Sequence, residues 1–274
     1  MKLTKAELKS ARQVEEKLAQ PSLSHDDIDW IYQNYHEGQQ GDVSAGAAHF
    51  TPYDLAFDTA LFAYTVGDIV DIAAGHGLLT YAAICRDYHE GHIRSVTCVE
   101  FNPVYHELSK RLLEPMSAYT RSNEPIKVNC VLGNMFDQSL WTSVTSGLTD
   151  GKFTHALSNP PFGAMSQADK ALASQWMNYT GKRDIAAIEL AHRVSHGATF
   201  ILPPGSVDFR YSGAPRGFER IPCRELDRLR KANPEMFMAM EADGIDGSCY
   251  RDQWRSTSIT VEVASICFDR QQYS

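Results

Sequence analysis

The sequence predicts an α/β fold in which a seven-stranded mixed sheet, mostly parallel with an antiparallel C-terminal hairpin, carries helices on both faces. Three observations support this prediction. Short apolar runs alternate with amphipathic helical patterns between residues 69 and 202, which is typical of a parallel sheet. Two further apolar runs close the chain and can pair as an antiparallel hairpin. The 274 residues are 43% hydrophobic and 22% charged, as in a soluble domain with a full core.

Two helical patterns, residues 4–20 and 26–35, open the chain and lead into a Gly-rich stretch. A segment of that composition is mobile unless something binds it. We therefore expect residues 1–46 to form N-terminal helices with a gating loop, and residues 47–274 to form the main domain. The patterns in this domain predict helices at 54–64, 78–86, 104–113, 168–177 and 184–194. They predict strands at 69–73, 95–100, 127–132, 154–158, 198–202, 236–241 and 258–268.

The charge balance limits the ways in which this chain could bind nucleic acid. The net charge is −8, from 26 basic and 34 acidic residues, which argues against broad coating of a polyanion. One local stretch, residues 208–231, is rich in basic side chains, although a merely solvated surface is the alternative reading. We expect a basic insertion at 205–235 that faces nucleic acid. Its candidate phosphate contacts are Arg210, Arg216, Arg220 and Arg224.

The spacing of the cysteines and histidines indicates whether the chain has a metal site and whether its compartment is reducing. The six cysteines form no C-x-x-C pair, and no histidines cluster at zinc spacing. We expect free thiols, a reducing cytoplasmic location and no metal site. The N-terminus lacks the apolar core of a signal peptide, and no apolar run is long enough to span a bilayer. We therefore expect no membrane association.

Residues after the first two strands point to a nucleoside-bearing cofactor, because ligands of such sheets bind at the carboxyl ends of the strands. Asp71 leads into a turn in which Gly75 and Gly77 permit positive φ and a close approach by a ligand. His76, between these glycines, is expected to be a turn residue and not a catalytic base. Glu100 ends the second strand, where a carboxylate can accept two hydrogen bonds from a ribose diol.

The third and fourth strands are also followed by polar residues. Asn134 is either a contact to an adenine edge or a simple turn residue, and Met135 could pack on the adenine face. The segment Asn159-Pro-Pro-Phe-Gly163 is the most specific signal in the chain. Its prolines fix the backbone and remove N–H donors, while Asn159 adds an amide oxygen and Phe162 a flat apolar face. A planar group carrying an NH₂ would meet acceptors and a stacking surface here.

The order of these motifs resembles that of the class I S-adenosylmethionine-dependent methyltransferases, specifically the gamma-type adenine-N6 DNA methylases, including modification subunits of type I restriction systems. The resemblance covers roughly residues 47–204. It rests on Phe50-Thr51-Pro52, Asp71-x-x-x-Gly75-x-Gly77, Glu100, Gly133-Asn134-x-Phe136 and Asn159-Pro-Pro-Phe-Gly163. It implies a Rossmann-like domain, S-adenosyl-L-methionine as cofactor, and methyl transfer to the N6 amino group of adenine in DNA.

The resemblance also implies roles for individual residues. Thr51 and the turn from Asp71 to Gly77 would hold the methionine part of the cofactor, and Glu100 would bind the ribose hydroxyls. The full implied cofactor set is Phe50, Thr51, Pro52, Asp71, Ala73, Gly75, Gly77, Glu100, Phe101, Asn134, Met135 and Asn159. The implied catalytic set, which would hold the target base, is Asn159, Pro160, Pro161 and Phe162.

Three other functions remain open at this stage. An RNA adenine-N6 methyltransferase would share the motifs. A protein glutamine N5 methyltransferase would use the same acceptors, although that family usually resembles Asn-Pro-Pro-Tyr where this chain has Phe162. A silent binding module would keep the pocket as a scaffold. We also expect no separate target-recognition domain, and therefore a solitary methylase with relaxed or short-context specificity, or dependence on a partner subunit.

Overall fold

The computed structural model describes residues 4–36, 49–122, 124–255 and 257–269. The expected gating loop and the expected boundary after residue 46 lie outside the described residues. The strands of the main sheet are β1 (Gly67–Ile72), β2 (Ile93–Glu100), β3 (Lys127–Leu132), β4 (His155–Ser158), β5 (Gly197–Leu202), β8 (Ala239–Ala242) and β9 (Glu262–Cys267). Their order is β3-β2-β1-β4-β5-β9-β8. β9 runs opposite to the other six strands of this sheet, which confirms the predicted fold class.

The sheet changes direction of growth at β1. β2 and β3 lie on one side of this strand, and β4 and β5 lie on the other. The register pairs Ile72 with Val99 of β2 and Asp71 with Leu157 of β4, so the carboxyl ends of the three strands lie level. A strand order of this kind opens a crevice where the loops after β1 and β4 diverge. The topology therefore predicts the ligand site at this edge.

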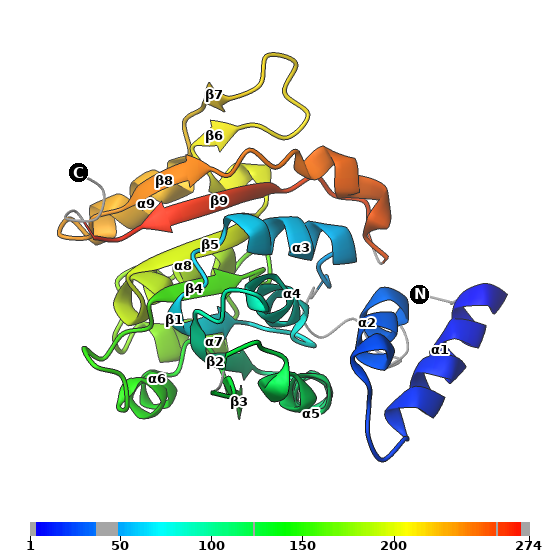
Figure 1. Ribbon diagram of the computed structural model, residues 1–274. Coiled ribbons are helices and arrows are strands. Elements are labelled where there is room, and N and C mark those ends of the chain that lie inside the picture. The colour runs from blue at the N-terminus through cyan, green and yellow to red at the C-terminus, as the bar shows by residue number, and fades with distance from the viewer. Residues whose placement is uncertain (1–3, 37–48, 123, 256, 270–274) are drawn as a thin grey trace.

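Helices cover both faces of the sheet (Figure 1). They are α1 (Lys5–Leu18), α2 (His25–Asn34), α3 (Tyr53–Phe62), α4 (Leu78–Asp87), α5 (Pro103–Leu113), α6 (Gln138–Thr145), α7 (Gln167–Ala173), α8 (Arg183–Val194) and α9 (Arg224–Ala232). One hydrophobic core packs α2 to α5 against the sheet, and a second packs α6 to α9. Successive strand residues serve opposite cores: Ile69 belongs to the first and Val70 to the second. Within the described residues, no helix has the length and apolar character that would let it cross a membrane.

The N-terminal helices pack on the first of these cores. Thr4 and Ser24 each begin a helix with a capping box, which satisfies backbone N–H groups that the helix itself leaves free. α2 buries Ile28, Ile31 and Tyr32 in the same core as α3 and α4. These helices lie at one side of the sheet in Figure 1. They are thus part of the structure that supports the turn after β1.

Two helices and a small ribbon have no counterpart in the sequence prediction. α6 is short, and the nine residues of α9 are so rich in charge that its buried Leu226 and Leu229 do not reveal a helical period. The ribbon pairs β6 (Phe209–Arg210) with β7 (Glu219–Arg220) and lies apart from the main sheet in Figure 1. Its strands are too short for an alternating pattern to indicate them.

Candidate active site

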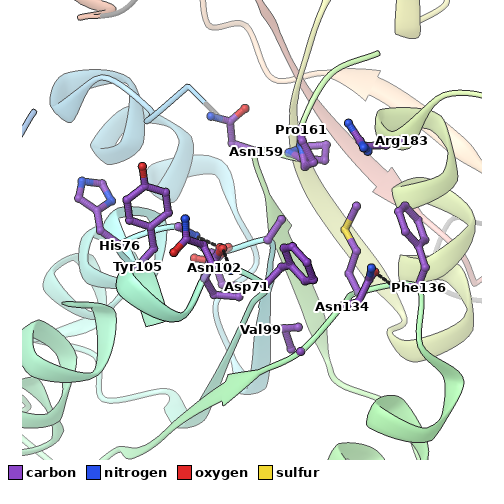
Figure 2. A pocket seen from close by; sticks show the side chains of 18 of the residues that line it. Asp71, His76, Val99, Asn102, Tyr105, Asn134, Phe136, Asn159, Pro161 and Arg183 are labelled. Atoms are coloured by element: carbon purple, nitrogen blue, oxygen red, sulfur yellow. Dashed lines mark hydrogen bonds between the residues drawn. The ribbon is translucent and has the colours of Figure 1, made fainter. Parts of the chain in front are cut away.

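A cavity of about 710 Å³ opens at the carboxyl ends of β1, β2 and β4 (Figure 2). The loop after β3 and the segment before α3 complete its wall. The structure brings together most of the residues that the sequence predicted. The predicted residues that line the cavity are Phe50, Thr51, Asp71, Ala73, Gly75, Glu100, Phe101, Asn134, Met135, Asn159, Pro160, Pro161 and Phe162. Pro52 and Gly77 are not among its lining residues.

Asp71 is a buried carboxylate with one uncompensated oxygen in this cavity. Its side chain is 2% exposed, and its Oδ2 accepts a hydrogen bond of 3.0 Å from Thr80 Oγ1. Its Oδ1 has no hydrogen-bond partner among the described residues. Burial raises the pKa of Asp71 to about 7. Burying a carboxylate oxygen costs free energy unless a hydrogen-bond donor or a cation contacts it. This atom therefore indicates where a positively charged ligand group would bind.

The glycines of the turn after β1 have positive φ angles, and one alanine in the same turn has one as well. Ala73 has a φ of 59°, a left-handed conformation that is strained for a residue with a Cβ. Gly77 has a φ of 86°, and a Cβ there would lie 2.7 Å from Leu113 Cδ1. Gly77 therefore serves the packing of α4 against α5 from behind the cavity. Pro52 likewise acts from outside the wall, as the residue that starts α3.

Glu100 links that turn to the end of β2. The side chain is 8% exposed, and Oε2 accepts a hydrogen bond of 2.8 Å from the backbone N–H of Gly75. Oε1 accepts one of 2.7 Å from the backbone N–H of Asn102. Burial raises the pKa of Glu100, and the backbone donors oppose that rise. The carboxylate is therefore fixed by backbone groups, and its remaining lone pairs can accept from a ligand.

His76 lines the cavity and belongs to an aromatic cluster there. Its ring stacks on Phe50 with centroids 4.0 Å apart, and Tyr32 contacts its edge at 5.2 Å. The Tyr32 hydroxyl also donates a hydrogen bond to the His76 carbonyl oxygen. Burial lowers the pKa of His76 to about 3, so the ring is neutral at physiological pH. This environment fits a packing residue of the turn and gives no sign of a general base.

The loop after β3 contains two polar contacts that engage Asn134. Its Oδ1 accepts a hydrogen bond of 2.9 Å from the Phe136 backbone N–H, and its Nδ2 donates one of 3.1 Å to Asp169 Oδ1. Asp169 in turn pairs with Arg183 at 3.0 Å. Asp169 and Arg183 both line the cavity, although sequence reasoning named neither. Neither residue belongs to the sequence motifs at the strand ends. Asp169 lies in α7, and Arg183 is the first residue of α8.

Asn159 has its side-chain amide held in one orientation. Its Nδ2 donates a hydrogen bond of 3.1 Å to the His49 carbonyl oxygen and another of 3.0 Å to Thr51 Oγ1. Both amide protons are thereby used, which leaves Oδ1 as the polar atom that a ligand can meet. Thr51 thus contacts the target loop and also lines the cavity, where the resemblance implies a contact with the cofactor. The side chain of Asn159 is seen beside Pro161 in Figure 2.

The end of the Asn-Pro-Pro-Phe-Gly loop is braced against α8. The Gly163 backbone N–H donates a hydrogen bond of 3.1 Å to Asp184 Oδ1, and the Arg183 N–H donates one of 2.8 Å to the Gly163 carbonyl. Asp184 is fully buried, and its other oxygen accepts from the Ser206 hydroxyl. Gly163 has a φ of 99°, which a residue with a side chain rarely adopts. The loop is therefore rigid where it meets the cavity.

The four arginines expected to contact nucleic acid do not line this cavity. Arg220 pairs with Asp208 at 2.7 Å, and its guanidinium lies over the Phe218 ring. Arg230 shares the same Asp208 carboxylate. Much of the positive charge in this stretch is therefore compensated locally. Within the described part of the chain, no ion pair involves the other three expected contacts, Arg210, Arg216 and Arg224. The described residues also contain no group of three or more side chains suited to hold a metal ion.

Comparison with known proteins bears on the fold. No family model and no curated protein matches this chain. Among solved structures, it is similar to a Listeria monocytogenes protein assigned as a class I S-adenosylmethionine-dependent methyltransferase. That match has a TM-score of 0.56 and 11% identity, over 92% of this chain and 71% of the other.

Two further similar structures are described as subunits of type I restriction-modification systems. One is a modification subunit from Vibrio vulnificus, with a TM-score of 0.54 and 12% identity over 89% of this chain and 50% of the other. The second is a methyltransferase subunit from Streptococcus thermophilus, with a TM-score of 0.55 and 16% identity over 90% and 51%. This chain therefore spans about half the length of those subunits. At such identities the likeness shows the architecture: the chain has the fold of the class I S-adenosylmethionine-dependent methyltransferases.

Proposed function

We propose that this protein binds S-adenosyl-L-methionine and transfers a methyl group to the N6 amino group of adenine in DNA. The observation that carries the proposal is the orientation of Asn159. With both amide protons donated to His49 and Thr51, the side chain presents an acceptor to the cavity. An acceptor at that place suits a substrate that brings N–H groups.

The residues of the cavity fit this cofactor. The unpartnered Oδ1 of Asp71 suits the ammonium of its methionine part. Glu100, fixed by backbone donors, suits the ribose hydroxyls. Met135 and Phe101 add apolar surface for the adenine. When bound, S-adenosyl-L-methionine supplies an electrophilic methyl group on a sulfonium centre.

The target side of the cavity favours an aromatic amine. Asn159 Oδ1 and the Pro160 carbonyl can each accept one N–H bond, and no N–H or hydroxyl group of the described residues donates to that carbonyl. Accepting both bonds favours a more tetrahedral nitrogen whose lone pair can point at the methyl group. Phe162 can stack on the base, a contact worth about 1–3 kcal/mol. Catalysis is then positioning by preorganised dipoles, and the product amine loses its proton to water.

The DNA assignment draws on several supports of different kinds. The motif order resembles DNA methylases, and two of the similar structures are named for restriction-modification systems. Because both of those similar structures are named as subunits, we also propose that this protein works with a partner subunit. A base in duplex DNA must leave the stack at a cost of a few kcal/mol, so single strands should react faster. Arg210, Arg216 and Arg224 remain our candidates for phosphate contacts.

The test uses purified protein with S-adenosyl-L-methionine and either duplex DNA, single-stranded DNA or RNA. Each product is digested to nucleosides and analysed by mass spectrometry. N6-methyladenine in DNA is the expected result, with more product from single strands. Methyl groups in RNA alone would move the function to an RNA methylase. No methylated nucleoside from any substrate, with the cofactor bound, would contradict the proposal and direct the search to glutamine side chains.

A further inference from the structure

Arg183 is a cationic side chain in the cavity that the proposed chemistry does not yet use. Arg183 lies next to the end of the target loop, because residues 163–165 pair with residues 181–183. The Arg183 N–H donates to the Gly163 carbonyl, and the Met165 N–H donates to the Gly181 carbonyl at 3.0 Å. In Figure 2, Arg183 and Asn159 lie on opposite sides of Pro161. A ring bound against this loop would therefore have Asn159 near one edge and Arg183 near the next.

Asp169 fixes the orientation of the Arg183 guanidinium. Nε and Nη2 of the arginine both lie 3.0 Å from Asp169 Oδ2. Asp169 is itself held by Asn134 at Oδ1 and by the capping box of Ser166. Nη1 has no acceptor among the described residues, and the side chain is 23% exposed. The guanidinium therefore offers a directed donor to whatever occupies the cavity.

We propose that Arg183 reads the target base by donating a hydrogen bond from Nη1 to a ring nitrogen that flanks the amino group held by Asn159. The inference rests on the proposed function. In adenine the amino group has such an acceptor on either side, N1 and N7. Asp169 acts as the positioning residue for Arg183. The contact distinguishes an amino-substituted heterocycle from a ring that lacks the acceptor.

The ion pair between Arg183 and Asp169 favours a base edge over a phosphate as the group that Arg183 binds. A phosphate site gathers unpaired positive charge, often from several side chains. Here the carboxylate cancels the charge of the guanidinium while leaving one donor group available. Burial opposes ionisation of Asp169, but hydrogen bonds from Asn134, Ser166 and Arg183 hold its pKa below the usual range, so the pair stays ionised. A neutral acceptor suits this arrangement better than a negatively charged phosphate.

The test measures binding, so that it does not depend on turnover. Protein saturated with S-adenosylhomocysteine, which fills the cofactor's own nucleoside site, is titrated with a thymidine oligonucleotide carrying one central deoxyadenosine. The same oligonucleotide is made with 1-deaza- and with 7-deaza-deoxyadenosine, and an all-thymidine strand provides the reference. We expect the deoxyadenosine strand to bind tighter than the reference. One of the two analogue strands should bind about tenfold or more weaker than the deoxyadenosine strand. Arg183→Met should bind the deoxyadenosine strand and both analogue strands equally.

Two further variants keep the result interpretable. Lys182→Met removes the neighbouring cation, which is absent from the cavity wall, and should leave discrimination intact. Because Arg183→Met leaves Asp169 without its ion-pair partner, Asp169→Asn/Arg183→Met provides a folded protein without the guanidinium and should match the single variant. Wild-type protein that treats both analogues like deoxyadenosine, or that gives deoxyadenosine no advantage, would overturn the inference. So would an Arg183→Met protein that discriminates normally or loses affinity for S-adenosylhomocysteine.

The two proposals fail separately in this design. Arg183-dependent discrimination without any N6-methyladenine would contradict the proposed methyl transfer and leave the contact standing. Methyl transfer at equal rates to deoxyadenosine and to both analogues would leave the proposed function standing and remove the contact.

Discussion

The two sides of the cleft differ in the charge of the groups that they present to a ligand. The cofactor side, formed by Asp71 and Glu100 after β1 and β2, presents buried carboxylates whose pKa values are raised by burial. The target side, formed by Asn159 and the loop after β4, presents a neutral amide fixed by two hydrogen bonds. Under the proposed function, this difference lets the first side bind the ammonium of the cofactor and the second side orient an uncharged amine. Substitutions should therefore separate affinity for the cofactor from the rate of transfer.

The largest expected effect is on the target side. Asn159→Ala removes the oriented acceptor and should lower the rate of methyl transfer at saturating cofactor by about 100-fold or more. Affinity for the cofactor should change little, because Asp71 and Glu100 are untouched. Single-turnover rates and calorimetric titrations give the two quantities. Asn129→Ala, on the exposed edge strand β3, is the matched control and should behave like wild type.

Asp71→Asn should produce the opposite separation. The isosteric amide cannot neutralise an ammonium, so affinity for S-adenosyl-L-methionine should fall by about tenfold or more. The variant should also unfold at a higher temperature at alkaline pH, because it no longer buries a charge there. Calorimetry and thermal melts measure the two effects. Asp26→Asn makes the same change on the surface and should do neither; a destabilised Asp71→Asn protein with normal affinity would reverse this assignment.

The pH dependence of cofactor binding should follow Asp71. Its pKa in the unliganded protein is about 7, and only the ionised form attracts the ammonium. Below that value a proton must be lost on binding, so affinity should fall by up to about tenfold per pH unit and level off at alkaline pH. Titrations across this range measure the slope. An equally steep slope in Asp71→Asn would assign it to another group.

Thr51 sharpens the boundary between the two sides. Thr51→Val removes one acceptor of the Asn159 amide and should slow transfer by about tenfold, with cofactor affinity nearly unchanged. Thr51→Ser keeps the hydroxyl and should remain close to wild type. Steady-state kinetics together with cofactor titrations decide the matter. A valine variant that binds the cofactor poorly but transfers normally would return Thr51 to the cofactor side, where the resemblance placed it.

The smallest expected effect concerns strain on the cofactor side. Ala73 occupies a left-handed conformation that glycine adopts freely. Ala73→Gly should raise stability by up to about 1 kcal/mol, because released strain exceeds the added flexibility of the unfolded chain. Chemical denaturation measures this change. A loss of stability would mean that the methyl group of Ala73 makes contacts worth more than the strain.

Local patterns were sufficient to predict the sheet and the strand ends, because strand burial, glycine turns and the Asn-Pro-Pro-Phe segment are all short-range signals. Contacts between distant segments were not predictable. The bond from Asn159 to Thr51 joins residues 108 positions apart, and that from Asn134 to Asp169 joins residues 35 apart. Gly77 shows the reverse case: its conformation was expected, but its reason is packing against Leu113 outside the cavity.

A crystal structure of the complex with S-adenosylhomocysteine tests the division of the cleft most directly. We expect the ligand's ammonium within hydrogen-bond distance of Asp71 Oδ1 and its ribose on Glu100. The Asn159 amide should still donate to His49 and Thr51, with Oδ1 facing the empty target space. A ligand whose ammonium contacts Asn159 Oδ1, or an Asn159 amide released from Thr51, would contradict the account.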